Sequence, residues 1–316
     1  MPKNTPEQLR EVIINVFQTK DIVLAFSTGT PGPFRKITAM IMDSAGNVLG
    51  FAKIGETQLA IQRIKHEASV LKLLFATYNL SPITNNYSLI SHQPSAISVK
   101  FPACLYEGEI DNAYLMIQSP APFEGKSGKI EFDENYAEIL QTLMNNTSVK
   151  KKFNESDFYE SLREGIDNYS LSYKDILRKG LNYLDEAVGD REITFTLSHG
   201  DFAPWNMIWK GKEIFIYDWE SANLEAPSGI DIVHFLFQTG FLLTKLRGDK
   251  LLRYILQSLT NQRLSKSLPI PLPDILVLLY FLHMAVTEDQ PQQLSSTAVE
   301  RRNLIIALAQ NSKSCN

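Results

Sequence analysis

The most informative stretch of the chain runs from Leu197 to Trp209 and reads Leu-Ser-His-Gly-Asp-Phe-Ala-Pro-Trp-Asn-Met-Ile-Trp. A second stretch, from Ile214 to Glu220, reads Ile-Phe-Ile-Tyr-Asp-Trp-Glu. Three polar residues matter here: Asp201, Asn206 five positions later, and Asp218 at the end of an apolar strand. A loop with this spacing can direct a carboxylate and an amide into one cavity, while the second carboxylate arrives on the adjacent β-ribbon. Such oxygen donors suit Mg²⁺, which leaves the first Asp to accept a proton from an attacking hydroxyl.

The same residues also have a purely structural interpretation. Asp201 and Asn206 would then cap and turn a surface loop, because Asp and Asn favour turns. The sequence around them favours chemistry instead, since His-Gly directly precedes Asp201 and Asp218 follows Asn206 by twelve positions. Asp, then Asn, then a metal-binding Asp is the order of the catalytic residues in the kinase fold.

The motif His-Gly-Asp-Phe-x-Pro-Trp-Asn, followed by Tyr-Asp-Trp-Glu, resembles the aminoglycoside phosphotransferase and choline kinase family. These are small-molecule kinases with a protein-kinase-like fold. The resemblance implies that Asp201 is the catalytic base and that Asn206 and Asp218 bind Mg²⁺. It also implies that His199 supports the loop through hydrogen bonds, that ATP is the phosphoryl donor, and that the partner is a small-molecule hydroxyl acceptor.

Two charged residues in the first third of the chain fit this interpretation. Lys53 is the only charge in the apolar segment Val48–Ile54, and Glu67 lies on the next predicted helix, Ile61–Tyr78. Glu67 falls at the edge of the apolar stripe of that helix, so the two side chains can pair. In the resembled family such a pair directs the ammonium at the ATP phosphates. The alternative is a snorkelling Lys and a solvated Glu, and the downstream motif favours the pair.

The segment Ser27–Pro33, Ser-Thr-Gly-Thr-Pro-Gly-Pro, is a weaker candidate for a phosphate-covering loop. It departs from Gly-x-Gly-x-x-Gly, and two prolines remove backbone donors. A plain turn is an equal alternative. If the segment binds phosphate, its hydroxyl and N–H groups supply the contacts. The predicted contacts are Ser27, Thr28 and Gly29.

Three further positions are placed less specifically by the sequence. Gln118 belongs to Met116–Ser119, where the adenine pocket is expected, and β-strand core is the alternative. Asp231 either hydrogen-bonds the catalytic loop or caps the helix that begins near it. His283 lies on an apolar helix and is expected to be a core histidine.

The pattern of apolar residues predicts an α+β fold. A helix near the N-terminus and several β-like segments come first, and from about Phe132 to Val188 the pattern is helical. A strand–loop–strand unit, Thr194–Trp219, interrupts the helices, which resume at Ile230. The resemblance implies a two-lobed protein-kinase-like fold with ATP between the lobes. We expect a small β-rich N-lobe over residues 1–118 and a larger, mainly helical C-lobe over residues 119–316.

Composition excludes several classes of protein. The chain has 316 residues, of which 44% are hydrophobic, and a formal net charge of -4. A globular core is therefore expected, and no basic surplus exists to bind nucleic acid. The two cysteines, Cys104 and Cys315, fit a reducing compartment.

The N-terminal segment lacks the apolar core of a signal peptide. Two apolar stretches, Ile230–Leu243 and Ile275–Val286, are shorter than the roughly 20 residues that span a bilayer. We therefore expect a cytoplasmic protein that does not bind membranes.

Three function classes follow from these patterns. The first is an ATP-dependent phosphotransferase with an alcohol group as acceptor, and its acceptor class stays open among aminoglycosides, amino alcohols, sugars, macrolides and homoserine-like compounds. The second is a nucleotide-binding pseudokinase scaffold, which the full set of catalytic residues disfavours. The third is a protein kinase, which the short interval between Asp218 and Ile230 disfavours. The sequence does not indicate an oligomeric state.

Overall fold

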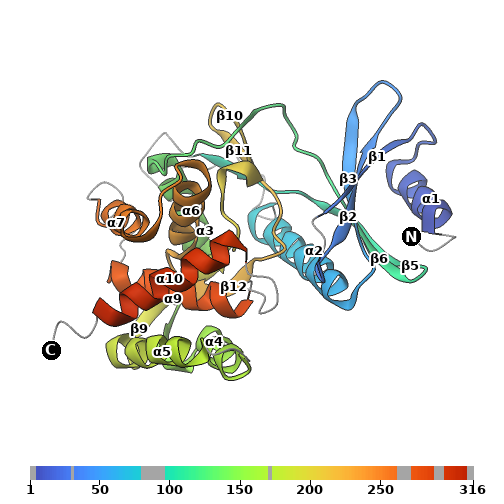
Figure 1. Ribbon diagram of the computed structural model, residues 1–316. Coiled ribbons are helices and arrows are strands. Elements are labelled where there is room, and N and C mark those ends of the chain that lie inside the picture. The colour runs from blue at the N-terminus through green and yellow to red at the C-terminus, as the bar shows by residue number, and fades with distance from the viewer. Residues whose placement is uncertain are drawn as a thin grey trace. The chain divides into compact units, whose positions relative to one another are not determined.

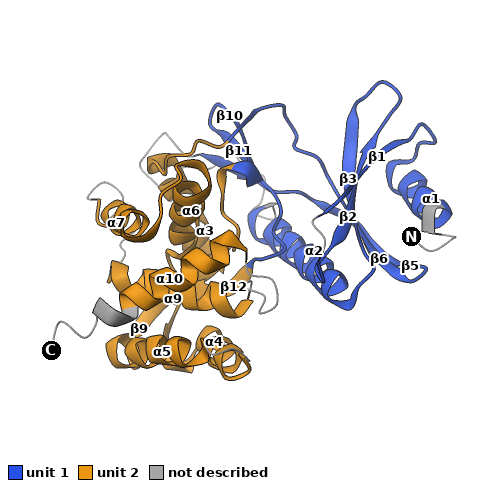
Figure 2. Ribbon diagram, viewed as in Figure 1, with its two compact units in different colours: residues 1–127, 205–222 blue, residues 128–204, 223–316 orange. Residues whose placement is uncertain are grey.

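A computed structural model describes residues 5–29, 32–79, 97–169, 173–261, 272–287 and 295–311. Thr30 and Pro31 of the predicted phosphate loop, and Cys315, lie outside these ranges. The chain divides into two compact units (Figure 2). The first comprises Met1–Ser127 and Trp205–Ala222, and the second comprises Gly128–Pro204 and Asn223–Asn316. The division of the chain into functional lobes at residues 118 and 119 stays a prediction.

The first unit is built on a five-stranded antiparallel sheet in the order β1-β2-β3-β6-β5. Helices α1 and α2 lie on opposite sides of this sheet (Figure 1). Since side chains alternate along a strand, β3 directs Ala52 and Ile54 to the core shared with α1, and Lys53 to the other face. The elements are α1 (Thr5–Phe17), β1 (Val23–Thr28), β2 (Lys36–Met42), β3 (Val48–Gly55), α2 (Gln58–Asn79), β5 (Cys104–Ile110) and β6 (Ala113–Gln118).

A second sheet of four strands explains why residues 205–222 belong to the first unit. Its order is β4-β11-β10-β7, and β10 and β11 form a tight hairpin. Gly211 has a φ of +61° at the turn of this hairpin, a conformation that glycine adopts without strain. The strands are β4 (Ser98–Lys100), β7 (Lys126–Ser127), β10 (Met207–Lys210) and β11 (Glu213–Ile216).

The second unit is mainly helical. Helix α9 is apolar on all sides and packs against α4, α5, α6, α7 and α10 (Figure 1). A helix with this composition is expected at the centre of a bundle rather than at its surface. The helices are α3 (Glu134–Thr147), α4 (Asp157–Asp167), α5 (Lys174–Val188), α6 (Ile230–Gln238), α7 (Gly248–Leu259), α9 (Pro273–Thr287) and α10 (Ser296–Asn311).

A three-stranded sheet, in the order β12-β9-β8, completes this unit. Its strands are β8 (Val149–Lys152), β9 (Glu192–Ser198) and β12 (Asn223–Pro227). The predicted α+β class is confirmed, but the expectation of helix throughout Phe132–Val188 is wrong at β8. Three consecutive lysines make β8 a charged edge strand, which pairs with β9 and has no helical periodicity to detect.

Among the described residues, no helix is both long enough and apolar enough to cross a bilayer.

Candidate active site

The centre of the candidate site in the first unit is the ammonium of Lys53. Its Nζ lies 2.6 and 2.7 Å from the two carboxylate oxygens of Glu67 on α2. It also lies 2.6 Å from Oδ1 of Asp218. Lys53 is 5% exposed and Glu67 is fully buried, so the ion pair that the sequence predicted is present inside the fold. A buried Lys needs such partners, because an unpaired charge inside a protein is costly.

The β10–β11 hairpin positions Asp218. Met207 pairs with Ile216, and the N–H of Tyr217 donates to the carbonyl of Asn206 at 3.1 Å. The hairpin therefore brings Asn206 and Asp218 to the same end of the ribbon. Asp218 has a φ of +68°, a left-handed conformation that Asp tolerates better than most residues. This local turn directs its carboxylate to Lys53.

The charges around Asp218 determine its protonation. Burial alone would raise the pKa of Asp218, but the charges of Lys53 and Lys36 outweigh burial and hold its pKa well below the ordinary value of 3.8. Burial likewise opposes charge on Lys53, and the carboxylates of Glu67, Asp218 and Glu220 reverse this and raise the pKa of Lys53. Both groups are therefore ionised at neutral pH.

Three further residues, which the sequence did not assign to the nucleotide site, extend this cluster. Lys36 begins β2 and contacts Asp218 Oδ1 at 3.3 Å, and it also pairs with Glu220. Arg63 of α2 lies 3.8 Å from Glu220 and stacks over the ring of Phe34. Lys36 lies two residues before Thr38, which pairs with Lys53 across the strands, so Lys36 and Lys53 lie on the same face of the sheet.

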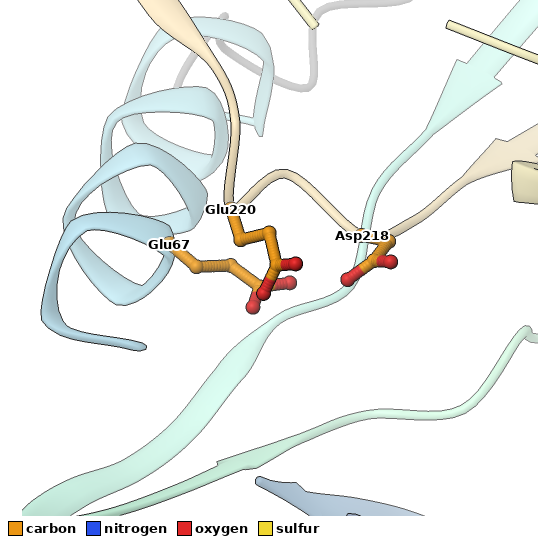
Figure 3. A group of neighbouring side chains, drawn as sticks. All are labelled: Glu67, Asp218 and Glu220. Atoms are coloured by element: carbon orange, nitrogen blue, oxygen red, sulfur yellow. The ribbon is translucent and has the colours of Figure 1, made fainter. Parts of the chain in front are cut away.

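Oxygen donors converge at this point. Figure 3 shows the carboxylates of Glu67, Asp218 and Glu220 directed toward one another, and one oxygen of each lies within 4.8 Å of the others. Glu67 is committed to Lys53 through both oxygens. Asp218 is about one-third exposed and is the better donor for a cation. An all-oxygen set fits Mg²⁺, which takes one or two carboxylates and completes its shell with water and phosphate.

A cavity of about 370 Å³ adjoins the cluster in the same unit. Phe51 and Lys53 lie on the same face of β3 and both line it. Gln118 is buried, and its Oε1 has no hydrogen-bond partner among the described residues. The volume falls within the usual range of small-molecule sites. The lining residues are Lys36, Thr38, Phe51, Lys53, Gln118, Ser119, Ala121, Ile208, Phe215, Tyr217 and Asp218.

The predicted phosphate loop begins at the end of β1. Ser27 and Thr28 are exposed, and the N–H of Gly29 donates to the carbonyl of Lys36 at 3.1 Å. This N–H is therefore engaged in pairing between the two strands. The hydroxyls of Ser27 and Thr28 stay the predicted phosphate contacts.

In the second unit, Asp231 anchors the loop that carries Asp201. Its carboxylate accepts hydrogen bonds from Ser198 Oγ at 2.8 Å, from the N–H of His199 at 2.8 Å, and from the N–H of Gly200 at 3.1 Å. Helix α6 has Gly229 at its N-cap, so Asp231 lies within the first turn. Of the two roles left open by the sequence, the hydrogen bonds to the loop are therefore the observed one.

Asp201 itself is held from two sides. Its N–H donates to Nδ1 of the fully buried His199 at 3.2 Å, which agrees with a supporting role for that histidine. Its Oδ1 lies 2.9 Å from Nε2 of His234 on α6, and the Asp201 side chain remains 35% exposed. The sequence places His234 just beyond Asp218 but does not predict its contact with Asp201.

Comparisons with known proteins place this geometry in context. No protein-family model and no curated protein sequence matches the chain. Several solved structures share its fold over nearly the full length. A thermostable mutant of the aminoglycoside phosphotransferase APH(4)-Ia, in its apo form, has a TM-score of 0.59 at 12% identity, covering 96% of this chain and 99% of that chain.

Two other similar structures are also kinases of small molecules by name. Choline kinase LicA from Streptococcus pneumoniae has a TM-score of 0.56 at 13% identity, covering 98% of this chain and 100% of its own. Amicoumacin kinase hAmiN, solved with AMP-PNP and Ca²⁺, has a TM-score of 0.54 at 11% identity, covering 99% of this chain and 97% of its own. At these identities the likeness establishes the fold, which is the one that the motif predicted.

Proposed function

We propose that this chain, which has the fold of small-molecule kinases, transfers the γ-phosphoryl group of ATP to a hydroxyl of a small molecule. The observation that carries the proposal is the buried ammonium of Lys53, held between Glu67 and Asp218 at the edge of a cavity. A cation fixed in this way is suited to bind nucleotide phosphates. Asp218 and Asn206 are the proposed ligands of Mg²⁺, which when bound neutralises charge on those phosphates.

Asp201 is the proposed base. In the transfer, an oxygen lone pair of the acceptor attacks the γ-phosphorus as the bond to the β-phosphate oxygen breaks, and ADP leaves. The proton of the acceptor hydroxyl passes to the Asp201 carboxylate. Because catalysis of this kind depends on positioning and charge neutralisation, the loss of either carboxylate, Asp201 or Asp218, is expected to cost orders of magnitude in rate.

The acceptor in this proposal is a small molecule rather than a protein. Strand β12, which has five residues, occupies much of the interval between Asp218 and α6 and pairs with β9. Little chain remains there for a long activation segment of the protein-kinase type. The similar structures give candidate acceptors. Another structure of APH(4)-Ia contains ADP and hygromycin B, the hAmiN structure contains amicoumacin, and LicA is a choline kinase.

The test is Mg²⁺-dependent release of ADP from ATP with a panel of acceptors. The panel contains aminoglycosides, choline, ethanolamine, homoserine, sugars and nucleosides, and Asp201→Asn serves as the blank. We expect acceptor-stimulated turnover approaching about 1–100 s⁻¹ for the right class, and a blank that still binds ATP. ATP binding without stimulated turnover would favour the scaffold alternative, and a protein that binds no ATP would contradict the proposal.

A further inference from the structure

Within the second unit, His234 contacts the side chain of Asp201, and Tyr280 contacts His234 in turn. Nε2 of His234 lies 2.9 Å from Asp201 Oδ1, and the hydroxyl of Tyr280 lies 3.2 Å from Nδ1 of the same imidazole. His234 comes from α6 and Tyr280 from α9, and both side chains are buried, with His234 only 3% exposed. A contiguous polar chain thus runs from the helical core to the partly exposed carboxylate.

Of the two neutral tautomers of His234, one satisfies both contacts. If the imidazole is neutral with its proton on Nε2, it donates to Asp201, and Tyr280 donates to Nδ1. The tyrosine then selects the tautomer that the carboxylate needs, much as a carboxylate selects the tautomer of a histidine in other sites. Both nitrogens of the buried imidazole thus have a hydrogen-bond partner, and a buried nitrogen without one would destabilise the fold.

We propose that His234, with its tautomer set by Tyr280, is a positioning residue for Asp201. The inference rests on the proposed function, because it concerns the group that accepts the acceptor's proton. The Nε2–H bond fixes the rotation of the carboxylate by holding Oδ1, so that Oδ2 is presented to the acceptor hydroxyl. The proton of the acceptor hydroxyl moves to Oδ2 of Asp201, and the imidazole of His234 keeps its proton on Nε2.

The size of the expected effect follows from geometry. A reacting group displaced by about 1 Å costs on the order of 10²-fold in rate. His234→Leu leaves the carboxylate without this donor, so kcat falls by roughly that factor while the KM for ATP stays within about twofold. His234→Gln offers an amide N–H near the position of Nε2 and restores kcat to within about tenfold of the wild type. Tyr280→Phe has an intermediate effect.

The matched control is His283, another histidine in the helical unit. It lies on α9, where its ring packs on Phe158 rather than on the loop that carries Asp201. His283→Leu removes an imidazole from the same core, and kcat stays within about twofold of the wild type. Thermal unfolding of each variant identifies any that fails to fold.

A double variant separates positioning from a general structural effect. If His234 acts through Asp201, then adding His234→Leu to Asp201→Asn lowers the residual activity no further, because residues that act as a unit are non-additive. A double variant that loses the product of the two single losses would overturn the proposal. So would a His234→Leu enzyme with unchanged kcat.

A readout independent of turnover completes the experiment. In ¹H–¹⁵N spectra of histidine side chains, the Nε2–H signal of His234 is expected in the wild type, shifted in Asp201→Asn and unchanged in His283→Leu. If this signal is present while no acceptor supports turnover, the proposed function fails and the pair itself stands. If turnover occurs and the signal is insensitive to Asp201→Asn, the positioning role fails and the proposed function stands.

Discussion

Lys53 Nζ lies 2.6 Å from Asp218 Oδ1, across 165 positions of sequence. The contact joins β3 of one sheet to the end of the β10–β11 hairpin in another, within a single compact unit. It gives the first unit a fixed cation and a fixed anion beside one cavity. The predictions below test what each of these groups contributes.

Lys53→Met is expected to destabilise the protein and to abolish turnover. Glu67 would keep a buried charge without its partner, which costs about 3–5 kcal/mol of unfolding free energy. The double variant Lys53→Met/Glu67→Gln should regain most of that stability and remain inactive. Urea unfolding measures the first effect and ADP release the second. The control is Lys65→Met, which alters an exposed lysine on α2, the helix of Glu67. An equal loss of stability and activity there would contradict the prediction.

Asp218→Asn is expected to abolish the Mg²⁺ dependence of nucleotide binding. The change removes the charged oxygen donor at the end of the hairpin, and Mg²⁺ relies on one or two carboxylates. The measurement is ATP affinity, by calorimetry, over a range of Mg²⁺ concentrations. Glu213→Gln alters a partly exposed carboxylate on the same hairpin, paired with Lys100, and should leave the dependence intact. A wild-type Mg²⁺ response in Asp218→Asn would remove this residue from the metal site.

Asp231→Ala is expected to loosen the loop that carries Asp201. Three donors, Ser198 Oγ and the N–H groups of His199 and Gly200, would lose a buried acceptor, at a cost of about 3 kcal/mol or more. Asp231→Asn keeps one acceptor oxygen and should be milder. The comparison variant is Asp249→Ala, since Asp249 also lies in the first turn of a helix but is exposed. Its loss should stay below about 1 kcal/mol in urea unfolding.

The unfolding free energy is expected to depend on pH through the buried side chain of His283. Burial is the main cause that lowers the pKa of His283 from 6.5 to about 4. The unfolded chain therefore binds a proton on His283 between these values and the folded chain does not, so stability falls as pH drops through this window. The loss is about 1–2 kcal/mol between about pH 7.5 and pH 5.

The control for this effect is the variant His283→Gln. Its unfolding free energy, measured in urea at the same two pH values, should change less than that of the wild type by about that amount. Equal pH profiles for the two proteins would show that His283 is not buried in its neutral form.

Local patterns account for the parts of the site that the sequence predicted. The alternation of β3 and the apolar stripe of α2 allow Lys53 to pair with Glu67, and the downstream motif favours that pair. The order of Asp201, Asn206 and Asp218 is readable as a motif. The same patterns predicted the helical regions and most strands of both units, missed β5, β7 and β12, and indicated helix at β8. There, lysine-rich residues form a strand only because β9 offers an edge to pair with.

The remaining site residues depend on contacts that no local pattern encodes. Lys36 reaches Asp218 through the register between β2 and β3 and the left-handed turn at Asp218. His234 meets Tyr280 because α6 packs on α9, 46 positions along the chain. Both contacts depend on tertiary packing, so the sequence pattern around these residues does not predict them.

The most direct test of the central claim follows the phosphoryl group itself. ³¹P NMR of the wild type with ATP, Mg²⁺ and a stimulating acceptor should show a phosphomonoester signal that grows in step with ADP. In Asp201→Asn this signal should grow orders of magnitude more slowly. Release of ADP with inorganic phosphate only, or ATP binding without any transfer to the acceptor panel, would contradict the assignment of this chain as a small-molecule kinase.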